Sequence, residues 1–279
     1  MKQTLTLAAL AVMCSCAAPQ QPSFDMATVE SDSVSVVWIK DKPGKLLQPV
    51  SLFGDVPDTL LTKLNLNGGV PSSVSCFLMY VEGQPVLFDA GLGMEQSQLR
   101  GLLAKCGISA DNVQTICLTH LHADHIGGLL HSDSVVFSNA VVYLNRVEYD
   151  AWMQMPAEQT QLQRRVLEAY ANNLKLFNIG DTLPFGIVPI DAYGHTPGHT
   201  AYQKNKVIII GDLIHGADLQ LPYPDYCAAF DMDKTKAVES RKRIVDYARQ
   251  NGLLMAGMHL PELGFISFSN DVVANTGNK

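Results

Sequence analysis

The chain has 279 residues, enough for one large domain or two small ones. Hydrophobic residues make up 47% of it and charged residues 17%, which is typical of a globular protein with a buried core. The formal net charge of −7 argues against nucleic acid as a partner, because nucleic-acid binding needs a clustered basic surface and no lysine- and arginine-rich run occurs.

The first residues follow the order of a secretory signal peptide. Lys2 precedes an apolar stretch from Leu5 to Met13, and small residues and the polar PQQPS segment come after it. The stretch is too short to cross a bilayer, and its alternative role is a first buried element of the domain. We expect a signal peptide over 1–18, a linker over 19–33 and one domain over 34–279. We therefore expect the protein to be exported to the periplasm or the cell surface.

The cysteines suggest two different roles. MCSCAAP resembles a bacterial lipoprotein cleavage site, in which Cys16 would carry a lipid that tethers the protein to a membrane. Four cysteines lie further along the chain: Cys76, Cys106, Cys117 and Cys227. They lack CxxC spacing, which excludes a zinc ribbon. Disulfide pairing is an alternative in an exported protein, but we expect free thiols because two of the four lie inside apolar runs.

Strands and helices are predicted to alternate along the domain. Apolar runs rich in β-branched residues predict strands over 34–39, 76–81, 85–91, 113–120, 140–145, 187–193 and 206–212. Helical spacing of apolar residues predicts helices near 95–105, 156–174 and 233–250. The proline-containing stretch 41–74 is expected to be a loop-rich insertion. This pattern predicts a layered α/β protein.

Histidines and aspartates gather at the ends of the predicted strands. In THLHADHIGG (119–128), residues two apart on an extended run point the same way, so His120 and His122 would aim together. Asp124 and His125 follow at the turn, and further strand ends offer His195, His199, Asp212, His215 and His259. Only one of the eight histidines, His131, lies elsewhere. If residues 119–128 were only a polar turn, no histidines or aspartates would be needed at the other strand ends. A catalytic metal site does need such additional ligands.

The ordered series THLHADHIGG, GHTPGH, GD and MHLP resembles the metallo-β-lactamase fold superfamily of metal-dependent hydrolases. GDLIHGADLQLPYPD, FDMDKTKAVESRKR and AGMHLPELG resemble its branch of methyl parathion hydrolase and lactonase-like enzymes. The similarity covers roughly residues 74–265. It implies a four-layer αβ/βα sandwich with a metal site at one edge.

The resemblance also implies a pair of divalent metal ions. The first would be held by His120, His122 and His195, the second by Asp124, His125 and His259, with Asp212 bridging both. Tyr193 stands where the family usually has a proline. Five imidazoles and two carboxylates without a thiolate suit Zn²⁺ first, with Mn²⁺, Fe²⁺ or Co²⁺ as alternatives.

The implied chemistry is hydrolysis of a small ester, lactone or phosphoester. A hydroxide shared by the two ions would attack the substrate, Asp124 and Asp212 would orient it, and Asp124 would pass a proton to the leaving group. β-Lactam hydrolysis is less expected, because those enzymes lack the bridging aspartate that Asp212 would supply. A non-catalytic metal-binding module on the same fold is the alternative from another functional class.

Four residues are expected to surround these ligands. His199 would support a ligand or pack the turn, and His215 would face the metals or the substrate. The segment 219–230 would supply an apolar pocket that contains Tyr223 and Phe230. Ordinary core packing is the alternative for these two aromatic residues.

Overall fold

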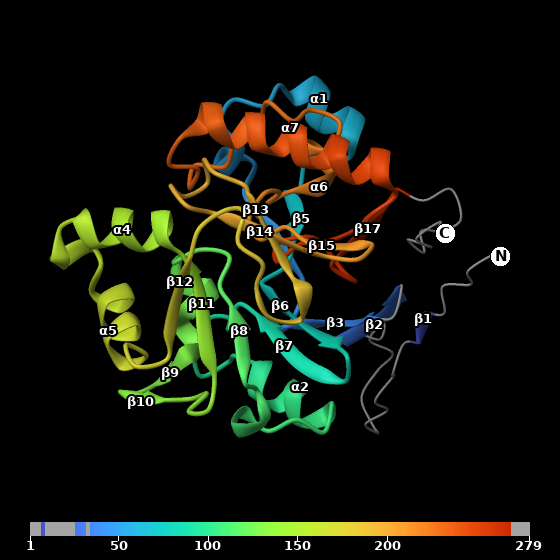
Figure 1. Cartoon of the computed structure of the whole chain (residues 1–279). Coiled ribbons are helices and arrows are strands. Elements are labelled where there is room, and N and C mark those ends of the chain that lie inside the picture. Colours follow the sequence, from blue (N-terminus) through green and yellow to red (C-terminus); the bar gives the residue numbers. More distant parts are fainter. Residues whose placement is uncertain (1–6, 9–25, 32–33, 269–279) are drawn as a thin grey trace.

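The computed structural model describes residues 7–8, 26–31 and 34–268 (Figure 1). Most of the predicted signal peptide, including Cys16, lies outside the described residues. Strand β1 (Leu7–Ala8) pairs with β2 (Met26–Ser31), so the second half of the predicted linker is a strand that also pairs with β3. Among the described helices, none combines the length and the apolar character needed to cross a membrane.

The larger sheet has eight strands in the order β1-β2-β3-β6-β7-β8-β11-β12. After β1 and β2 come β3 (Val34–Lys40), β6 (Ser75–Val81), β7 (Gln84–Phe88), β8 (Thr115–Cys117), β11 (Val141–Asn145) and β12 (Leu174–Phe177). Neighbours from β1 to β7 are antiparallel, and neighbours from β7 to β12 are parallel. The parallel strands β7 and β8 therefore end at the same edge of the sheet.

The smaller sheet has five strands in the order β13-β14-β15-β16-β17. They are β13 (Val188–Asp191), β14 (Thr200–Lys204), β15 (Val207–Ile209), β16 (Leu254–Ala256) and β17 (Phe265–Ser267). Only the pair β15 and β16 is parallel. Two short ribbons pair β4 (Leu46–Gln48) with β5 (Val70–Ser72) and β9 (Leu130–His131) with β10 (Ser134–Val135).

Helices cover the outer faces of both sheets. The α-helices are α1 (Asp58–Leu64), α2 (Leu99–Lys105), α3 (Ala123–Ile126), α4 (Arg146–Gln154), α5 (Gln161–Ala169), α6 (Ala217–Gln220) and α7 (Lys234–Asn251). Short 3₁₀ helices are η1 (Val50–Phe53), η2 (Ala110–Asn112), η3 (Gly127–Leu129), η4 (Ala157–Gln159) and η5 (Pro184–Gly186). The longest, α7, begins after Asp233, whose side chain accepts a hydrogen bond from the Lys236 amide, and ends at Gly252 in the left-handed conformation.

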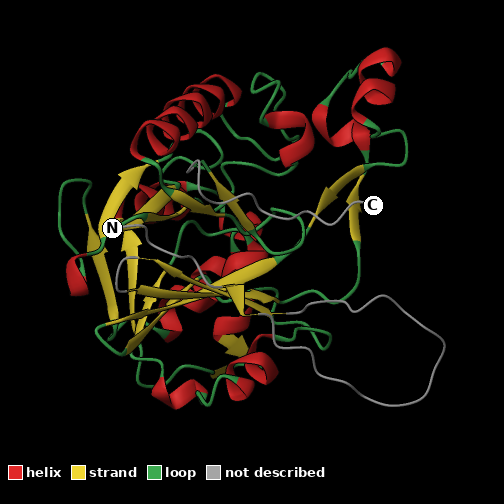
Figure 2. Cartoon of the chain, turned by 90° about the vertical axis from the view of Figure 1, so that its right-hand side faces the viewer, coloured by secondary structure: helices red, strands yellow, loops and turns green. Residues whose placement is uncertain are grey.

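The buried residues form separate layers between these elements. One cluster, with Trp38, Phe77 and Tyr202, fills the space between the two sheets. A second packs the other face of the larger sheet against α2 and α5, and a third packs the smaller sheet against α7. Figure 2 shows the strands lying between helices at the top and bottom. The predicted four-layer αβ/βα sandwich is confirmed.

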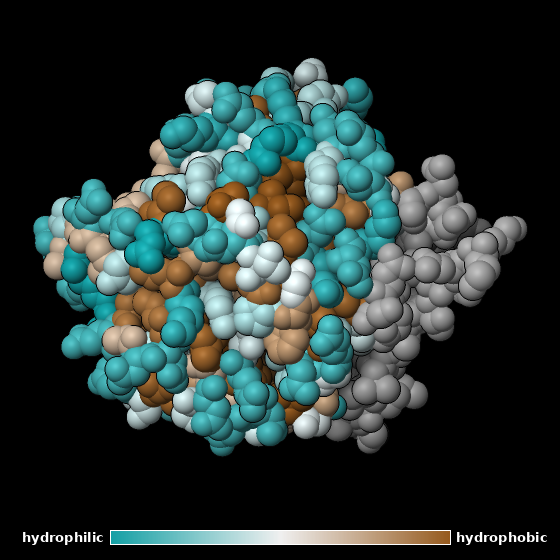
Figure 3. All heavy atoms as spheres, viewed as in Figure 1, coloured by the Kyte–Doolittle hydropathy of each residue, from teal (hydrophilic) through white to brown (hydrophobic). Residues whose placement is uncertain are grey.

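The surface carries both hydrophilic and hydrophobic residues on the face seen in Figure 3. In Figure 3 hydrophilic residues dominate the rim of the face, and hydrophobic residues reach the surface in patches between them. Of the predicted free thiols, Cys76 and Cys117 are buried, Cys106 and Cys227 are half-buried, and these four described cysteines are unpaired. This agrees with the expectation from their apolar surroundings.

The sequence prediction differs from the structure mainly at short elements. Each predicted strand and helix has a counterpart, but most observed elements are shorter because the chain bends at the strand ends that carry the polar motifs. The expected loop-rich stretch 41–74 contains β4, η1, α1 and β5. Helix α4 and strands β12, β14, β16 and β17 were not among the predicted elements.

Candidate metal centre

Three histidines converge where β8 and β13 end. His122 is the N-cap of α3, so the chain is still extended at His120 and His122 before it turns into the helix. His195 lies in the loop between β13 and β14. The three ring nitrogens face one another: His120 Nε2 is 3.0 Å from His122 Nδ1 and 3.2 Å from His195 Nε2, and the last pair is 2.9 Å apart. We call these three residues the histidine triad.

A second group lies beside the triad. Asp124 and His125 come from α3, and His259 follows β16. Their ligand atoms lie within 4.8 Å of one another. His259 Nε2 is 3.4 Å from Asp124 Oδ2, and His125 Nε2 is 3.7 Å from the same oxygen. Asp124 is the most open of the three, with 27% of its side chain exposed.

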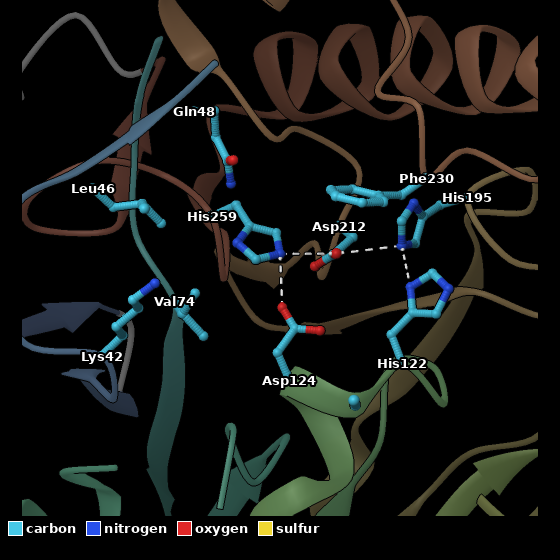
Figure 4. Close-up of a pocket in the computed structure, with 11 residues that line it drawn as sticks. Lys42, Leu46, Gln48, Val74, His122, Asp124, His195, Asp212, Phe230 and His259 are labelled. Atoms are coloured by element: carbon cyan, nitrogen blue, oxygen red, sulfur yellow. Dashed lines mark hydrogen bonds and ion pairs between the residues drawn. The ribbon is translucent and has the colours of Figure 1, made fainter. Parts of the chain in front are cut away.

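Asp212 lies between the two groups (Figure 4). It follows β15, and its Oδ2 is 3.3 Å from His195 Nε2 in the triad and 3.0 Å from His259 Nε2 in the second group. Its Oδ1 is 3.1 Å from His125 Nε2. One buried carboxylate therefore contacts ring nitrogens of both groups, and the seven residues named from the sequence come together at one site.

The contacts of the Nδ1 atoms, which face away from the site, indicate the state of the Nε2 atoms, which face into it. Backbone carbonyl oxygens only accept hydrogen bonds, so the 2.7 Å contact fixes a proton on His259 Nδ1 facing the Ser73 oxygen. His125 Nδ1 lies 2.7 Å from Asp89 Oδ2, and His195 Nδ1 lies 2.9 Å from Asp231 Oδ1. When these rings are neutral, as they must be to bind a cation, the proton on Nδ1 leaves Nε2 with a lone pair that faces the site.

The donor set fits divalent cations. Burial lowers the pKa of His122 to about 3 and that of His120 well below its usual value, so both rings are neutral. In the tautomers that direct lone pairs inward, the neutral rings of His120 and His122 repel at 3.0 Å unless a cation lies between them. Nitrogens bound 2.0–2.1 Å from a tetrahedral zinc ion lie about 3.3 Å apart, close to this spacing. Among the described residues, His125 Nε2 and Asp212 Oδ1 lie 3.1 Å apart and are buried without a hydrogen-bond partner, as expected for two ligands of a cation.

Charge in the second group has a different balance. Burial alone would lower the pKa of His259, but Asp212 and Asp124 raise it to about 10. Burial alone would raise the pKa of Asp212, but His125, His259 and His120 hold it well below its usual value. Without a cation, histidines of this group are therefore protonated at neutral pH. A bound cation must displace those protons.

Two carboxylates that the sequence analysis did not single out support the ligands. Asp89 accepts hydrogen bonds from the Thr119 amide and hydroxyl, both at 2.7 Å, in addition to His125. Asp231 accepts from the Ala228 amide at 3.1 Å and from buried Arg241 at 3.3 Å, in addition to His195. Asp89 lies near the end of the predicted strand 85–91 and directly follows the observed strand β7, so the strand-end rule that identified the other residues would have found it too.

His199 and His215 have distinct places. His199 donates from Nδ1 to the Ala192 oxygen at 2.9 Å, and its Nε2 accepts from the Asp212 amide at 3.0 Å. It therefore positions the backbone of Asp212. The His215 ring stacks on His259 with centroids 5.1 Å apart, and its Nε2 is 3.2 Å from Asp212 Oδ2. Both ring nitrogens of His215 are buried without a hydrogen-bond partner among the described residues.

A cavity of about 370 Å³ opens onto the two groups. Its wall is formed by Lys42, Leu46, Gln48, Val74, His122, Ala123, Asp124, His195, Asp212, Phe230 and His259 (Figure 4). The side chain of Phe230 lies near His195, as Figure 4 shows. The stretch 41–74, where no chemistry was expected, supplies most of the wall opposite to Phe230.

Of the two aromatic residues expected in the pocket, Phe230 lines the cavity and Tyr223 does not. Tyr223 is not in the cavity wall, and its hydroxyl accepts a hydrogen bond from Lys63 of α1 at 3.1 Å. Helix α6 turns the segment after Asp212 towards α1, where Leu219 and Ala228 are buried in a small core cluster. Only the end of the segment, at Phe230, returns to the cavity.

Comparison with known proteins places this geometry in a family. The model of the metallo-β-lactamase superfamily matches residues 69–248. The crystal structure of the hydrolase AbOPH has 28% sequence identity and a TM-score of 0.76, covering 88% of this chain and 94% of that one. AidC, a dizinc quorum-quenching lactonase, has 24% identity and a TM-score of 0.76 over 86% and 92% of the two chains.

A shorter match is to part of a larger enzyme. Ribonuclease Z of Clostridioides difficile is 42% identical over 74 residues, which are 25% of this chain and 22% of that enzyme. The family model, in contrast, spans well over half of the chain. It includes Asp212 and the two loops after β8 and β13 that carry the histidine triad. The chain belongs to the metallo-β-lactamase superfamily.

Proposed function

We propose that this protein is a hydrolase of small esters, lactones or phosphoesters that works with two divalent cations, Zn²⁺ first among them. The histidine triad would hold one cation, and Asp124, His125 and His259 would hold the other. The single observation that carries the proposal is the position of Asp212, whose carboxylate contacts both groups at 3.0 to 3.3 Å.

The residues divide the chemistry between them. Bound cations of this kind supply an activated water and polarise the substrate oxygen. Asp212, held by its amide to His199, keeps the two groups at a fixed separation. Asp124 is partly exposed at the cavity, and His125 and His259 keep its pKa below the usual value although burial alone would raise it. Its carboxylate is therefore ionised at neutral pH, which is the state required of a group that accepts a proton from water and returns it to a leaving group.

The cavity favours a small substrate with an apolar part. Leu46, Val74 and Phe230 offer apolar contact, whereas Lys42 and Gln48 offer hydrogen-bond donors. A cavity of about 370 Å³ has the size of a small-molecule site. The net charge of −7 does not favour RNA as a substrate. The similarity to AbOPH and AidC supports the branch of methyl parathion hydrolase and lactonase-like enzymes within the superfamily.

A substrate panel tests the proposal. Protein stripped with a chelator and reloaded with zinc is assayed with a chromogenic carboxylic ester, homoserine lactones of varied chain length and a phosphotriester. We expect turnover of at least one class that disappears on stripping and returns with zinc. Two bound cations without turnover of any class would favour a non-catalytic metal-binding module. Turnover of a chromogenic β-lactam alone would assign the enzyme to that substrate instead.

We also propose that the protein is exported and tethered by lipid at Cys16. The charged, apolar and small residues at the start of the sequence support this, and the −7 net charge does not oppose it. Labelling with radioactive palmitate in a bacterial host should mark the wild-type protein and not the Cys16→Ser variant. Unlabelled wild-type protein would refute the lipid anchor and leave the hydrolase proposal intact.

A further inference from the structure

Glu148 is a fully buried carboxylate outside the cavity wall and outside the two ligand groups. It lies in the first turn of α4, in a stretch where the sequence offered no chemical motif. A buried carboxylate needs compensating hydrogen bonds, so its partners indicate its role.

Four donors meet this carboxylate: three come from the two loops that carry the triad, and the fourth, Trp152, comes from α4 itself. Its Oε1 accepts from the Leu121 amide at 3.0 Å and from Trp152 Nε1 at 2.7 Å. Its Oε2 accepts from the Thr196 hydroxyl and the Gly198 amide, each at 2.8 Å. Four donors on two oxygens fill the acceptor capacity of an ionised carboxylate.

Two of these donors are immediate neighbours of the triad in the sequence. Leu121 lies between His120 and His122, and Thr196 follows His195. The carboxylate is therefore a bridge between the loop after β8 and the loop after β13. Gln163 of α5 holds the next peptide group, donating to the Leu121 carbonyl oxygen at 2.9 Å.

Two further contacts tie α4 to the triad. The Trp152 ring, which Glu148 holds through Nε1, meets the His122 ring edge-on at 5.6 Å between centroids. At Gly198 a Cβ atom would overlap with the backbone of Glu148, so the turn that follows His195 packs directly on the helix. The loops have little room to separate or slide while this contact holds.

We propose that Glu148 is a positioning residue that joins the two histidine loops and thereby sets the affinity of the triad for its cation, without contacting the cation. The inference rests on the proposed function, because the triad must bind a cation. Residues that orient metal ligands affect metal affinity or activity by about 10- to 100-fold when they are changed. The second group is tied to Asp89 and Ser73 instead. We therefore expect an effect on one cation and not on both.

The test uses Co²⁺ binding to the full chain. The Glu148→Gln variant keeps the volume but turns an amide group towards two of the four donors. Asp150→Asn, an exposed change on the same helix, is the matched control. Apo protein is titrated with Co²⁺ in competition with a chromophoric chelator, and the visible absorption of bound Co²⁺ is recorded. We expect one of two sites to weaken by about 10- to 100-fold in Glu148→Gln, with a changed spectrum for that site. The control should match the wild type.

Each outcome decides a different point. Two sites of wild-type affinity and spectrum in Glu148→Gln would overturn the inference. Equal weakening of both sites would also overturn it, because Glu148 would then support the fold as a whole and not the triad. If Glu148→Gln does not fold, Thr196→Val removes a single donor and should weaken the same site by a smaller factor; unchanged binding there overturns the inference as well. Wild-type protein that binds no Co²⁺ would refute the proposed metal site itself, and this inference with it.

Discussion

Replacing Asp212 with asparagine removes one negative charge from the point where the two groups meet. The side chain keeps its volume, so the fold should persist. The carboxylate lies 3.0 to 3.3 Å from ring nitrogens of His125, His195 and His259, so it serves both groups. Unit charges about 4 Å apart interact by about 4 kcal/mol at an effective dielectric of about 20, which corresponds to about three powers of ten in affinity.

We therefore expect both zinc dissociation constants of Asp212→Asn to rise by about 100- to 1,000-fold, and zinc-dependent turnover to be lost at micromolar zinc. Competition with a chromophoric chelator measures the constants, and circular dichroism checks the fold. Asp218→Asn, an exposed aspartate six positions further along the chain, is the matched control. Asp212→Asn protein that binds two zinc ions with wild-type affinity would refute the assignment of Asp212 as the shared ligand.

Three further predictions follow from the same contacts. Asp89→Asn leaves the His125 Nδ1 proton without its carboxylate, so the second cation should bind about 10- to 100-fold more weakly by chelator competition; unchanged affinity would contradict this. Gly211→Ala places a side chain at φ +53° and against His199 Nε2, so urea unfolding should show a loss of at least about 1 kcal/mol; equal stability would contradict it. Because the pKa of His259 is raised to about 10, zinc must displace its proton, and apparent affinity for the second ion should fall at least about tenfold for each pH unit lowered from 9 to 7; calorimetry in two buffers detects the released protons, and a pH-independent affinity would contradict this.

The strand ends made the site predictable from the sequence. The loop after β8 of the larger sheet and the loops after β13, β15 and β16 of the smaller sheet bring distant histidines to one edge of the sandwich. The spacing of His120 and His122 also fixed their common direction. The layer order followed from the alternation of strands and helices together with the family resemblance, and the structure confirms it.

The supporting residues were less predictable, because their roles depend on packing across the fold. Glu148 acts through donors 27 and 50 positions away, and no local pattern marks it. Lys42, Leu46 and Gln48 come from a stretch whose prolines predicted only loops. Tyr223 was misplaced because its distance from Asp212 along the chain does not show that α6 turns it towards Lys63.

The central claim is that seven side chains hold two cations beside one cavity. Diffraction from crystals grown with zinc, measured on both sides of the zinc absorption edge, tests it most directly. The account predicts two anomalous peaks, one within the histidine triad and one among Asp124, His125 and His259, with the Asp212 carboxylate between them. A single peak, or peaks away from these residues in fully loaded protein, would contradict it.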